Sequence, residues 1–421
     1  MIFRKIFFSA AVLLAAGGLA GAQVSLGDCI ALSYDNYPQI KELDLIEKTR
    51  DYELSNAAIS WLPQLNISGK ATWQSEVVEM PFEMPGFEFN IPHDQYSLTA
   101  DLTQQIWDGG ASAAKKEAAV SSAEVKSRQL EVNLYSIRSR VQNIFLGIIL
   151  LDKQLEINEL LEKNLRRSQD EIRALQENGM ALKSDLDQLS VNLLSTLQQR
   201  ASLEADRSSY VKMLSLMTGR DLSSIEFQAP EIEELMPDTS FSGRPELALY
   251  DSQTRQNEVQ LKQLNTALSP KLNLTLQGGY GRPGMNMLSG EFSGYFVAGV
   301  KLQWNIAALY TRSNDKRKLQ AEASRIEISR QSFLLNSSIE AEQKNNELVK
   351  ARDVLERDGE IIALRESIRE TGERQYREGT LKMNDYLSML DEEYKARLNR
   401  SLHEVQLMMA IYDLKNTTGQ N

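Results

Sequence analysis

The stretch PQLNISGKATW at residues 63–73 returns as PKLNLTLQGGY at residues 270–280, an offset of 207 (270 − 63). In both stretches apolar or small residues alternate with polar ones, which is the period of a β-strand with two different faces. Residues 96–103 and 296–304 alternate in the same way. We therefore predict four strands of about 9–11 residues, the length of a tilted strand that crosses a bilayer.

The duplication extends well beyond the strands. Other residues recur at fixed offsets: Pro38 as Pro245, Gly179 as Gly379, Asp185 as Asp385, and Thr218-Gly219 as Thr418-Gly419. The offset is 207 before the strands (245 − 38) and 200 after them (379 − 179), which places a seven-residue surplus between Trp73 and Tyr96. A tandem unit of this kind is typical of a pseudo-symmetric scaffold rather than an enzyme with one asymmetric site.

The N-terminus predicts export. Arg4 and Lys5 precede an apolar run from Ile6 to Leu19, and Ala20-Gly21-Ala22 follows it. A charged start, a short apolar core and an A-x-A site predict a signal peptide over residues 1–22. An uncleaved membrane anchor is the alternative, although the run is shorter than the roughly 20 residues that a spanning helix needs. We expect the only cysteine, Cys29, to be a small buried side chain.

The composition excludes several classes of function. The net charge of −11 argues against a nucleic-acid partner, which would need a basic surface. There are two histidines, His93 and His403, and the chain has no Cys/His cluster, Gly-rich phosphate loop or Ser/His/Asp arrangement. We therefore expect no enzyme activity, no cofactor and no metal site.

Aromatic residues at the ends of the four stretches favour a membrane barrel. Trp73, Tyr96, Tyr280 and Trp304 occupy the positions of the girdles that mark a membrane interface. A soluble antiparallel sheet with one wet face would alternate in the same way, but the sequence offers no other core for it. Four strands cannot close a barrel, and lipid leaves no backbone group unpaired, so the chain must oligomerise. Two protomers would give about eight strands and a filled interior, and three would give about twelve and a water channel.

The remaining sequence predicts long helices. About Ala111 to Glu177 carries apolar residues at 3-4 spacing, typical of a coiled-coil seam. The seam residues are Leu134, Ile137, Val141, Ile144, Ile148, Leu151 and Leu155. A helix of this length spans roughly 100 Å. Its counterpart runs from about Leu309 to Arg377, with Ala341, Lys344 and Ala351 at three seam positions, so we expect the second hairpin to be held less firmly.

Shorter helices complete the predicted tube. They cover about Asp28 to Ser60, Leu182 to Met217, Arg244 to Leu268 and Met383 to Lys415. Each long helix then lies beside two short ones stacked end to end, because the total lengths are about equal. We predict a mainly α chain of tandem helical hairpins with transmembrane β-strands. The domains are repeat 1 (23–220), a linker (221–242) and repeat 2 (243–421).

These features together resemble the TolC family of outer-membrane efflux and secretion channels. The residues that carry the resemblance are Pro63-Gln64-Leu65, Pro270-Lys271-Leu272, the run from Gln104 to Gly110, and Tyr376-Arg377-Glu378-Gly379-Thr380 with Asp385 and Leu387. The resemblance covers nearly the whole chain after the signal peptide. It implies a homotrimer whose twelve-stranded barrel in outer-membrane lipid continues into an α-barrel tunnel across the periplasm.

The resemblance also implies where the functional residues lie. Asp185, Tyr376, Lys382 and Asp385 fall on the periplasmic entrance, which the family closes by links between coils and lines with acidic rings. Leu381 stands where the family often has arginine, and Ser388 where a second acid is common, with Asp391 one turn further on. From the residues alone, Asp185 and Asp385 also fit early-helix acids that the helix dipole stabilises.

The predicted function is an exit duct for an efflux pump or a type I secretion system. The family resemblance implies two partners, a periplasmic adaptor protein and an inner-membrane transporter. The adaptor would meet the glycine tips at Gly179, Met180, Gly379 and Thr380. The alternative from another class is a periplasmic or surface coiled-coil structural protein without a pore.

Overall fold

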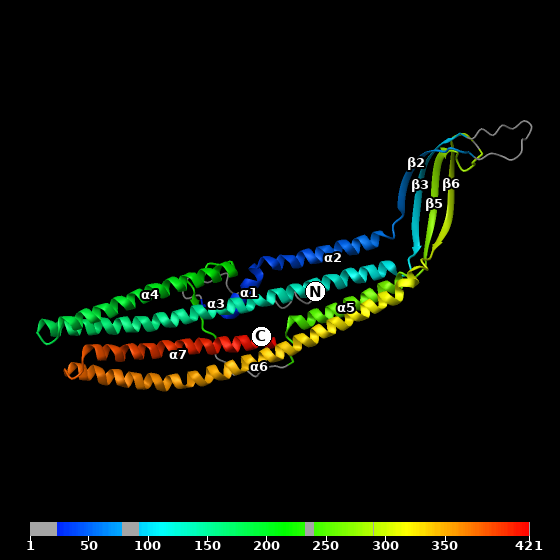
Figure 1. Ribbon diagram of the computed structural model, residues 1–421. Coiled ribbons are helices and arrows are strands. Elements are labelled where there is room, and N and C mark those ends of the chain that lie inside the picture. The colour runs from blue at the N-terminus through cyan, green and yellow to red at the C-terminus, as the bar shows by residue number, and fades with distance from the viewer. Residues whose placement is uncertain (1–22, 78–91, 232–239, 289, 421) are drawn as a thin grey trace, which may run out of the picture. The chain divides into compact units, whose positions relative to one another are not determined.

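The computed structural model describes residues 23–77, 92–231, 240–288 and 290–420 (Figure 1). The predicted signal peptide and most of the seven-residue surplus lie outside these residues. The chain divides into two compact units, each built from both repeats. We call Glu42–Gln129 with Glu246–Gln331 the sheet unit, and the remainder the tip unit. The predicted repeat boundaries stay predictions, because the units cut across them.

The sheet unit contains the four predicted strands. They are β2 (Gln64–Trp73), β3 (Asp94–Trp107), β5 (Lys271–Arg282) and β6 (Ser293–Gln303). They form one antiparallel sheet in the order β2-β3-β5-β6. The register pairs Ile67 with Ala100 and Leu276 with Ala298, so the apolar series of all four strands share one face. β3 continues further than predicted, to Trp107, after an irregularity in its pairing with β5.

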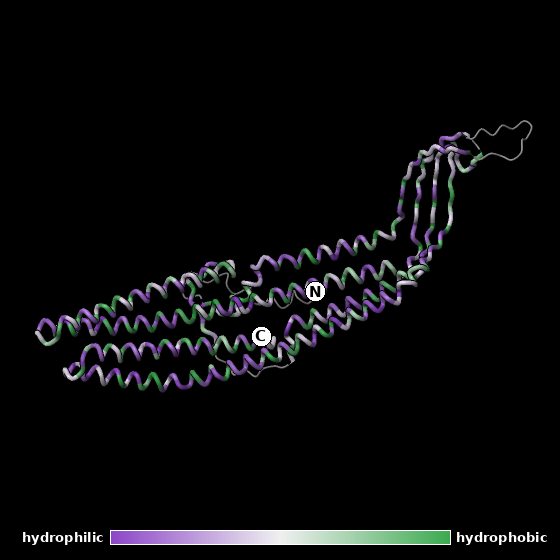
Figure 2. The backbone as a smooth tube through the Cα atoms, in the orientation of Figure 1, coloured by the Kyte–Doolittle hydropathy of each residue, from purple (hydrophilic) through white to green (hydrophobic). Residues whose placement is uncertain are grey.

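The two faces of the sheet differ in chemistry, as the alternating colours along the strands show (Figure 2). On the apolar face Leu65, Ile67 and Val300 are exposed, and Phe296 has 76% of its surface accessible. On the opposite face the Ser68 and Thr99 hydroxyls lie 2.8 Å apart. The side chain of Gln277 donates to Asp101 at 2.6 Å. A large exposed apolar face needs a partner surface or lipid.

The first helix differs from its prediction. A single helix over Asp28 to Ser60 is wrong: the structure has α1 (Leu26–Asn36), a 3-10 turn η1 (Pro38–Ile40) and α2 (Lys41–Ile59). Proline disfavours helical backbone in the residue before it, and Tyr37 accordingly has ψ 127°. In the second repeat the corresponding Pro245 begins α5 (Pro245–Thr266) at its first turn, where proline is well tolerated.

Two long hairpins end in the tip unit. The first is α3 (Ala111–Glu177) with α4 (Lys183–Thr218), and the second is α6 (Ala308–Arg377) with α7 (Met383–Thr418). The predicted seam residues of α3 are buried, except that Leu155 is partly exposed. At the Lys344 position of α6 the seam holds an ion pair instead, 3.1 Å from Asp413 of α7. Among the described residues no helix is both long and apolar enough to cross a membrane.

One strand pairing had no sequence signal. β1 (Gln23–Val24) pairs in parallel with β4 (Glu226–Phe227), which lies in the predicted linker. The neighbouring linker residues Leu222 and Phe241 are buried. Cys29 on α1 is fully buried, as predicted.

Candidate functional site

The tips of the two hairpins have the same backbone geometry. Gly179 and Gly379 have φ of +72° and +73°, in the left-handed region that glycine adopts without strain. The amide of the next residue donates to a carbonyl five residues back: Met180 to Leu175 at 2.8 Å, and Thr380 to Gln375 at 2.9 Å. This is the Schellman ending of a helix. The chain reverses sharply at both predicted tips.

The two tips differ in the residue that follows the glycine. Met180 is an exposed apolar side chain. The Thr380 hydroxyl donates back to the Gln375 carbonyl at 3.0 Å, which ties it to its own turn. The tips therefore expose one apolar and one hydroxyl-bearing side chain.

The return helices begin with the predicted acids. Leu182 and Lys382 are the N-cap residues of α4 and α7, and neither makes a side-chain capping bond. Asp185 and Asp385 lie in the first turn, where the helix dipole stabilises negative charge. The structure thus supports the interpretation of both residues as early-helix acids that the helix dipole stabilises. This position does not conflict with a place on an entrance.

An apolar cluster joins the two hairpins behind the tips, and we call it the latch. Its buried members are Leu165 and Ile172 of α3, Leu189 and Leu193 of α4, and Met383, Tyr386, Leu387 and Leu390 of α7. Tyr376 of α6 and Leu381 pack against it. All four long helices contribute, so the hairpins cannot separate without exposing these side chains. Apolar burial of this kind is favourable by about 1.5–3 kcal/mol per large side chain.

Tyr376 belongs to the latch rather than to a hydrogen-bonded gate within one chain. Its ring stacks on Tyr386, with centroids 5.9 Å apart and the planes at 19°. Burial, and to a smaller extent the nearby charge of Asp185, raises the pKa of Tyr376 to about 12. Among the described residues its hydroxyl has no hydrogen-bond partner. The predicted link from this hydroxyl to a carboxylate is therefore not formed inside the protomer.

The structure brings together only part of the predicted entrance set. Asp185 of the first hairpin lies close enough to Tyr376 of the second to shift its pKa. Lys382 and Asp385 are exposed and form no ion pair with any described residue. Leu381, at a position where the family often has arginine, packs against the latch and so replaces a charge with an apolar contact.

Ionic links between the hairpins were missed by sequence reasoning. Arg377 of α6 lies 3.0 Å from Glu171 of α3, and also 2.9 Å from Glu373. Within the second hairpin, Arg369 lies 2.9 Å from Glu373 of its own helix and 2.9 Å from Glu393 of α7. The four-residue spacing of Glu373 and Arg377 was a signal for a pair within one helix. Nothing in the sequence indicated the partners on the other helices.

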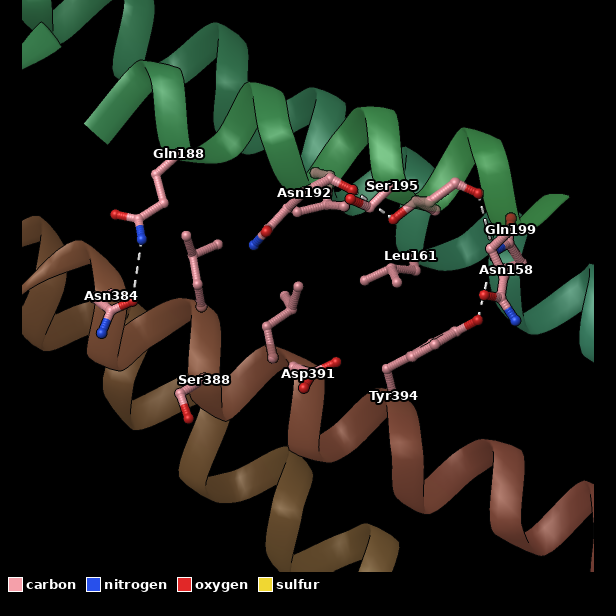
Figure 3. A pocket seen from close by; sticks show the side chains of 14 residues that line it. Asn158, Leu161, Gln188, Asn192, Ser195, Gln199, Asn384, Ser388, Asp391 and Tyr394 are labelled. Atoms are coloured by element: carbon pink, nitrogen blue, oxygen red, sulfur yellow. Dashed lines mark hydrogen bonds between the residues drawn. The ribbon is translucent and has the colours of Figure 1, made fainter. Parts of the chain in front are cut away.

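A polar groove lies beside the latch, between α4 and α7 (Figure 3). Its volume is about 520 Å³, and amides and hydroxyls from both helices line it, including Asn192, Ser195 and Ser388. Gln188 donates across it to Asn384 at 3.1 Å. Asp391 is its only charged side chain. Ser388, which departs from the family pattern, therefore lines a hydrogen-bonding groove that also contains the acid Asp391.

The predicted girdle aromatics are all exposed on the sheet unit. Trp73, Tyr96 and Tyr280 lie near the hairpin-loop ends of their strands, whereas Trp304 follows the helix end of β6. Trp304 donates its indole N–H to the Leu268 carbonyl at 2.9 Å. Two further exposed tryptophans, Trp61 and Trp107, lie near the helix end of the strands. The sequence analysis did not include them in the predicted girdle.

No group of three or more His, Cys, Asp or Glu side chains in the described ranges could hold a metal ion. His93 stacks on Trp73, and His403 lies 2.7 Å from Asp358. Both histidines have a structural partner.

Residues 30–220 match the family model described as outer membrane efflux protein. The first repeat is therefore similar to the outer membrane efflux protein family. The second repeat copies the matched unit.

Solved outer-membrane channels share the fold of this chain. The channel OprN has a TM-score of 0.68 at 16% identity over 94% of this chain and 90% of its own. The Campylobacter jejuni channel CmeC has 0.66 at 16% identity over 94% and 85%. The Vibrio cholerae outer membrane protein VceC has 0.67 at 13% identity over 94% and 96%. No curated protein sequence matches the chain. The predicted fold class is confirmed, and the family match agrees with the predicted resemblance over the first repeat.

Proposed function

We propose that this protein is a homotrimeric outer-membrane channel that serves as the exit duct of an efflux pump or a type I secretion system. The observation that carries the proposal is the open four-stranded sheet, whose outer strands β2 and β6 have no second partner among the described residues. Lipid does not tolerate unpaired strand edges. Pairing β2 of one protomer with β6 of the next removes every edge, and three protomers give about twelve strands around a water-filled interior.

The exposed faces of the sheet support this arrangement. The apolar face would meet lipid, and the face with Ser68, Thr99 and Gln277 would line the channel. The long hairpins would continue the channel into the periplasm. A coiled-coil structural protein would have no use for a lipid-length apolar face, and no observation favours that alternative or a catalytic role.

The tips are the proposed docking site for a periplasmic adaptor, which in turn would connect to an inner-membrane transporter. Gly179, Met180, Gly379 and Thr380 support this because their side chains or backbone are exposed at the ends of both hairpins. The latch is the proposed closure, with Asp185, Tyr376, Lys382 and Asp385 at the entrance. Opening would require the hairpins to part at the latch.

The mass of the purified protein in mild detergent tests the proposal. Native mass spectrometry should give three protomers, and heating in denaturing detergent should convert them to monomers. Reconstituted trimers should insert into a planar bilayer and produce discrete steps in its conductance. A stable monomer, or a trimer recovered in the soluble periplasmic fraction, would contradict the channel and favour the structural alternative.

A further inference from the structure

The junction between β6 and α6 carries a run of exposed apolar and aromatic side chains. They are Leu302, Trp304, Ile306, Leu309 and Tyr310. Tyr310, in the first turn of α6, has 84% of its surface accessible. Aromatic side chains with an apolar body and a polar tip are enriched where a membrane meets water. Packing against other parts of the described chain does not account for these apolar side chains, because they remain exposed.

A basic segment follows within three helical turns. Arg312, Lys316, Arg317 and Lys318 are all exposed, and Asp315 is the only acid between residues 308 and 318. Arg312 donates to Asn265 at 3.2 Å, and Lys318 lies 3.7 Å from Asp315. Lys316 and Arg317 form no ion pair with any described residue. The first turn of α6 contains no acid, although a helix start favours one.

The same position of the first repeat carries only part of this combination. At an offset of 200, Gly109-Gly110 stands in place of Leu309-Tyr310, and Glu117 in place of Arg317. Ser112, in place of Arg312, is buried. The first repeat keeps one of the cations, Lys116 in place of Lys316, and has Lys115 in place of Asp315. It lacks the counterparts of Tyr310, Arg317 and Lys318, so the fold of a repeat does not require these side chains. A partner specific to the second repeat explains the difference better.

We propose that residues 309–318 bind the headgroups of anionic phospholipids in the periplasmic leaflet of the outer membrane. The inference rests on the membrane placement of the sheet, which puts the helix end of β6 at that leaflet. Lys316 to Lys318 follow Tyr310 by six to eight residues, about 9–12 Å along the helix. Tyr310 would sit at the interface, and the three cations would lie within about one Debye length of it.

The positive charge of residues 309–318 favours anionic over zwitterionic lipid headgroups. Each Lys or Arg close to an anionic surface strengthens attraction by about fivefold. Three neighbouring cations per protomer would therefore select anionic over zwitterionic headgroups, and the preference would weaken with salt. Anchoring would fix the depth and rotation of α6 at the membrane.

A charge-neutralising triple variant tests the inference. Lys316→Gln, Arg317→Gln and Lys318→Gln remove the segment's charge. Lys350→Gln, Arg352→Gln and Arg357→Gln are the matched control, because they remove the same charge from exposed positions on the same helix. Each protein is reconstituted in nanodiscs of phosphatidylglycerol and phosphatidylcholine. Native mass spectrometry then counts the lipids that stay bound at low and high salt.

Wild type and the control should retain phosphatidylglycerol with at least about tenfold preference at low salt, less at high salt, and the segment variant should lose it. Equal retention of both lipids by wild type, or an unchanged preference in the segment variant, would overturn the inference. Loss of co-sedimentation with purified peptidoglycan, while lipid preference persists, would also overturn it and assign the segment to the cell wall. Conductance of wild-type trimers reports the channel separately, so failure of the proposed function is distinguishable.

Discussion

The structure makes the thiol of Cys29 unreactive in the folded protein. It is fully buried on α1, and burial raises the pKa of its thiol to about 12, with the charge of Asp28 as a second cause. Only the thiolate reacts with maleimides. At pH 8 about one thiol in ten thousand would be ionised, because the pKa lies about four units higher.

We therefore expect native protein to resist maleimide labelling at pH 8 and denatured protein to label fully. Mass spectrometry of the labelled chain measures the extent. Met180→Cys is the control, because this exposed tip position should take up one label under native conditions. Rapid labelling of wild type would mean that α1 opens readily.

The ends of the return helices show how the two repeats solve one problem with different residues. The Asn36 side chain donates to the Leu216 and Met217 carbonyls at 3.2 and 3.1 Å, and so covers the end of α4. Arg244 donates to the Asn416 and Thr417 carbonyls at 3.0 and 3.2 Å, at the end of α7. These carbonyls have no partner within their own helix.

Arg244 makes more than hydrogen bonds. Its guanidinium lies 5.1 Å from the ring centroid of Tyr135 and 5.2 Å from that of Phe333. Cation–π contacts of this kind add about 0.5–2 kcal/mol, and hydrogen bonds from a charged group about 1.5–3 kcal/mol. The end of α7 is therefore held more strongly than the end of α4.

Arg244→Ala should lower the free energy of unfolding by about 2 kcal/mol or more, and Asn36→Ala by about 1 kcal/mol. Thermal unfolding followed by circular dichroism in detergent should rank the midpoints in that order. Arg357→Ala, an exposed position on α6, should leave the midpoint within the error. Equal midpoints for Arg244→Ala and wild type would show that these contacts contribute nothing.

The residues beside the tip glycines test whether the hairpin ends contact a partner. Met180→Trp or Thr380→Trp changes the surface at the turn while the glycine keeps its left-handed φ. We expect both variants to form trimers and to lose export, because a bulky ring would block the proposed adaptor contact. Substrate efflux in whole cells measures export, and native mass spectrometry measures assembly. Gly359→Ala is the control, since its added methyl would meet no neighbouring atom within 4 Å. Normal efflux in the tip variants would limit these residues to the turn.

In the whole molecule the entrance residues would act as rings. A trimer places six carboxylates from Asp185 and Asp385 near one aperture, which favours cations. Latch packing within each protomer would combine with links between protomers. The Tyr376 hydroxyl has no partner among the described residues of its own chain, and we propose that it bonds a carboxylate of a neighbouring protomer.

Single-channel recordings separate these contributions. Asp185→Asn with Asp385→Asn should lower the preference for cations in a planar bilayer. Tyr376→Phe should raise conductance if the hydroxyl bridges protomers, and Tyr376→Ala should raise it further, because the stack on Tyr386 is also lost. Glu360→Gln, an exposed position on the same helix, is the control. Unchanged recordings in all variants would place the gate elsewhere.

Much of the fold could be read from local patterns. Strand alternation and coiled-coil spacing located the four strands and both long hairpins to within a few residues, apart from the extension of β3. Positive φ at Gly179 and Gly379 follows from the local demands of a sharp turn. The break at Pro38 was also a local signal, which the prediction of one continuous helix overrode.

Only the tertiary structure decided which distant residues meet. Arg377 and Glu171 lie 206 positions apart in the chain, and Arg244 reaches the end of α7 from 172 positions away. Tyr376 joined the latch instead of making a hydrogen bond, because burial against Tyr386 offered its ring a better environment. Periodicity reports the face that a residue occupies on its own element. It carries no information on the facing element, because the partner depends on packing between segments far apart in sequence.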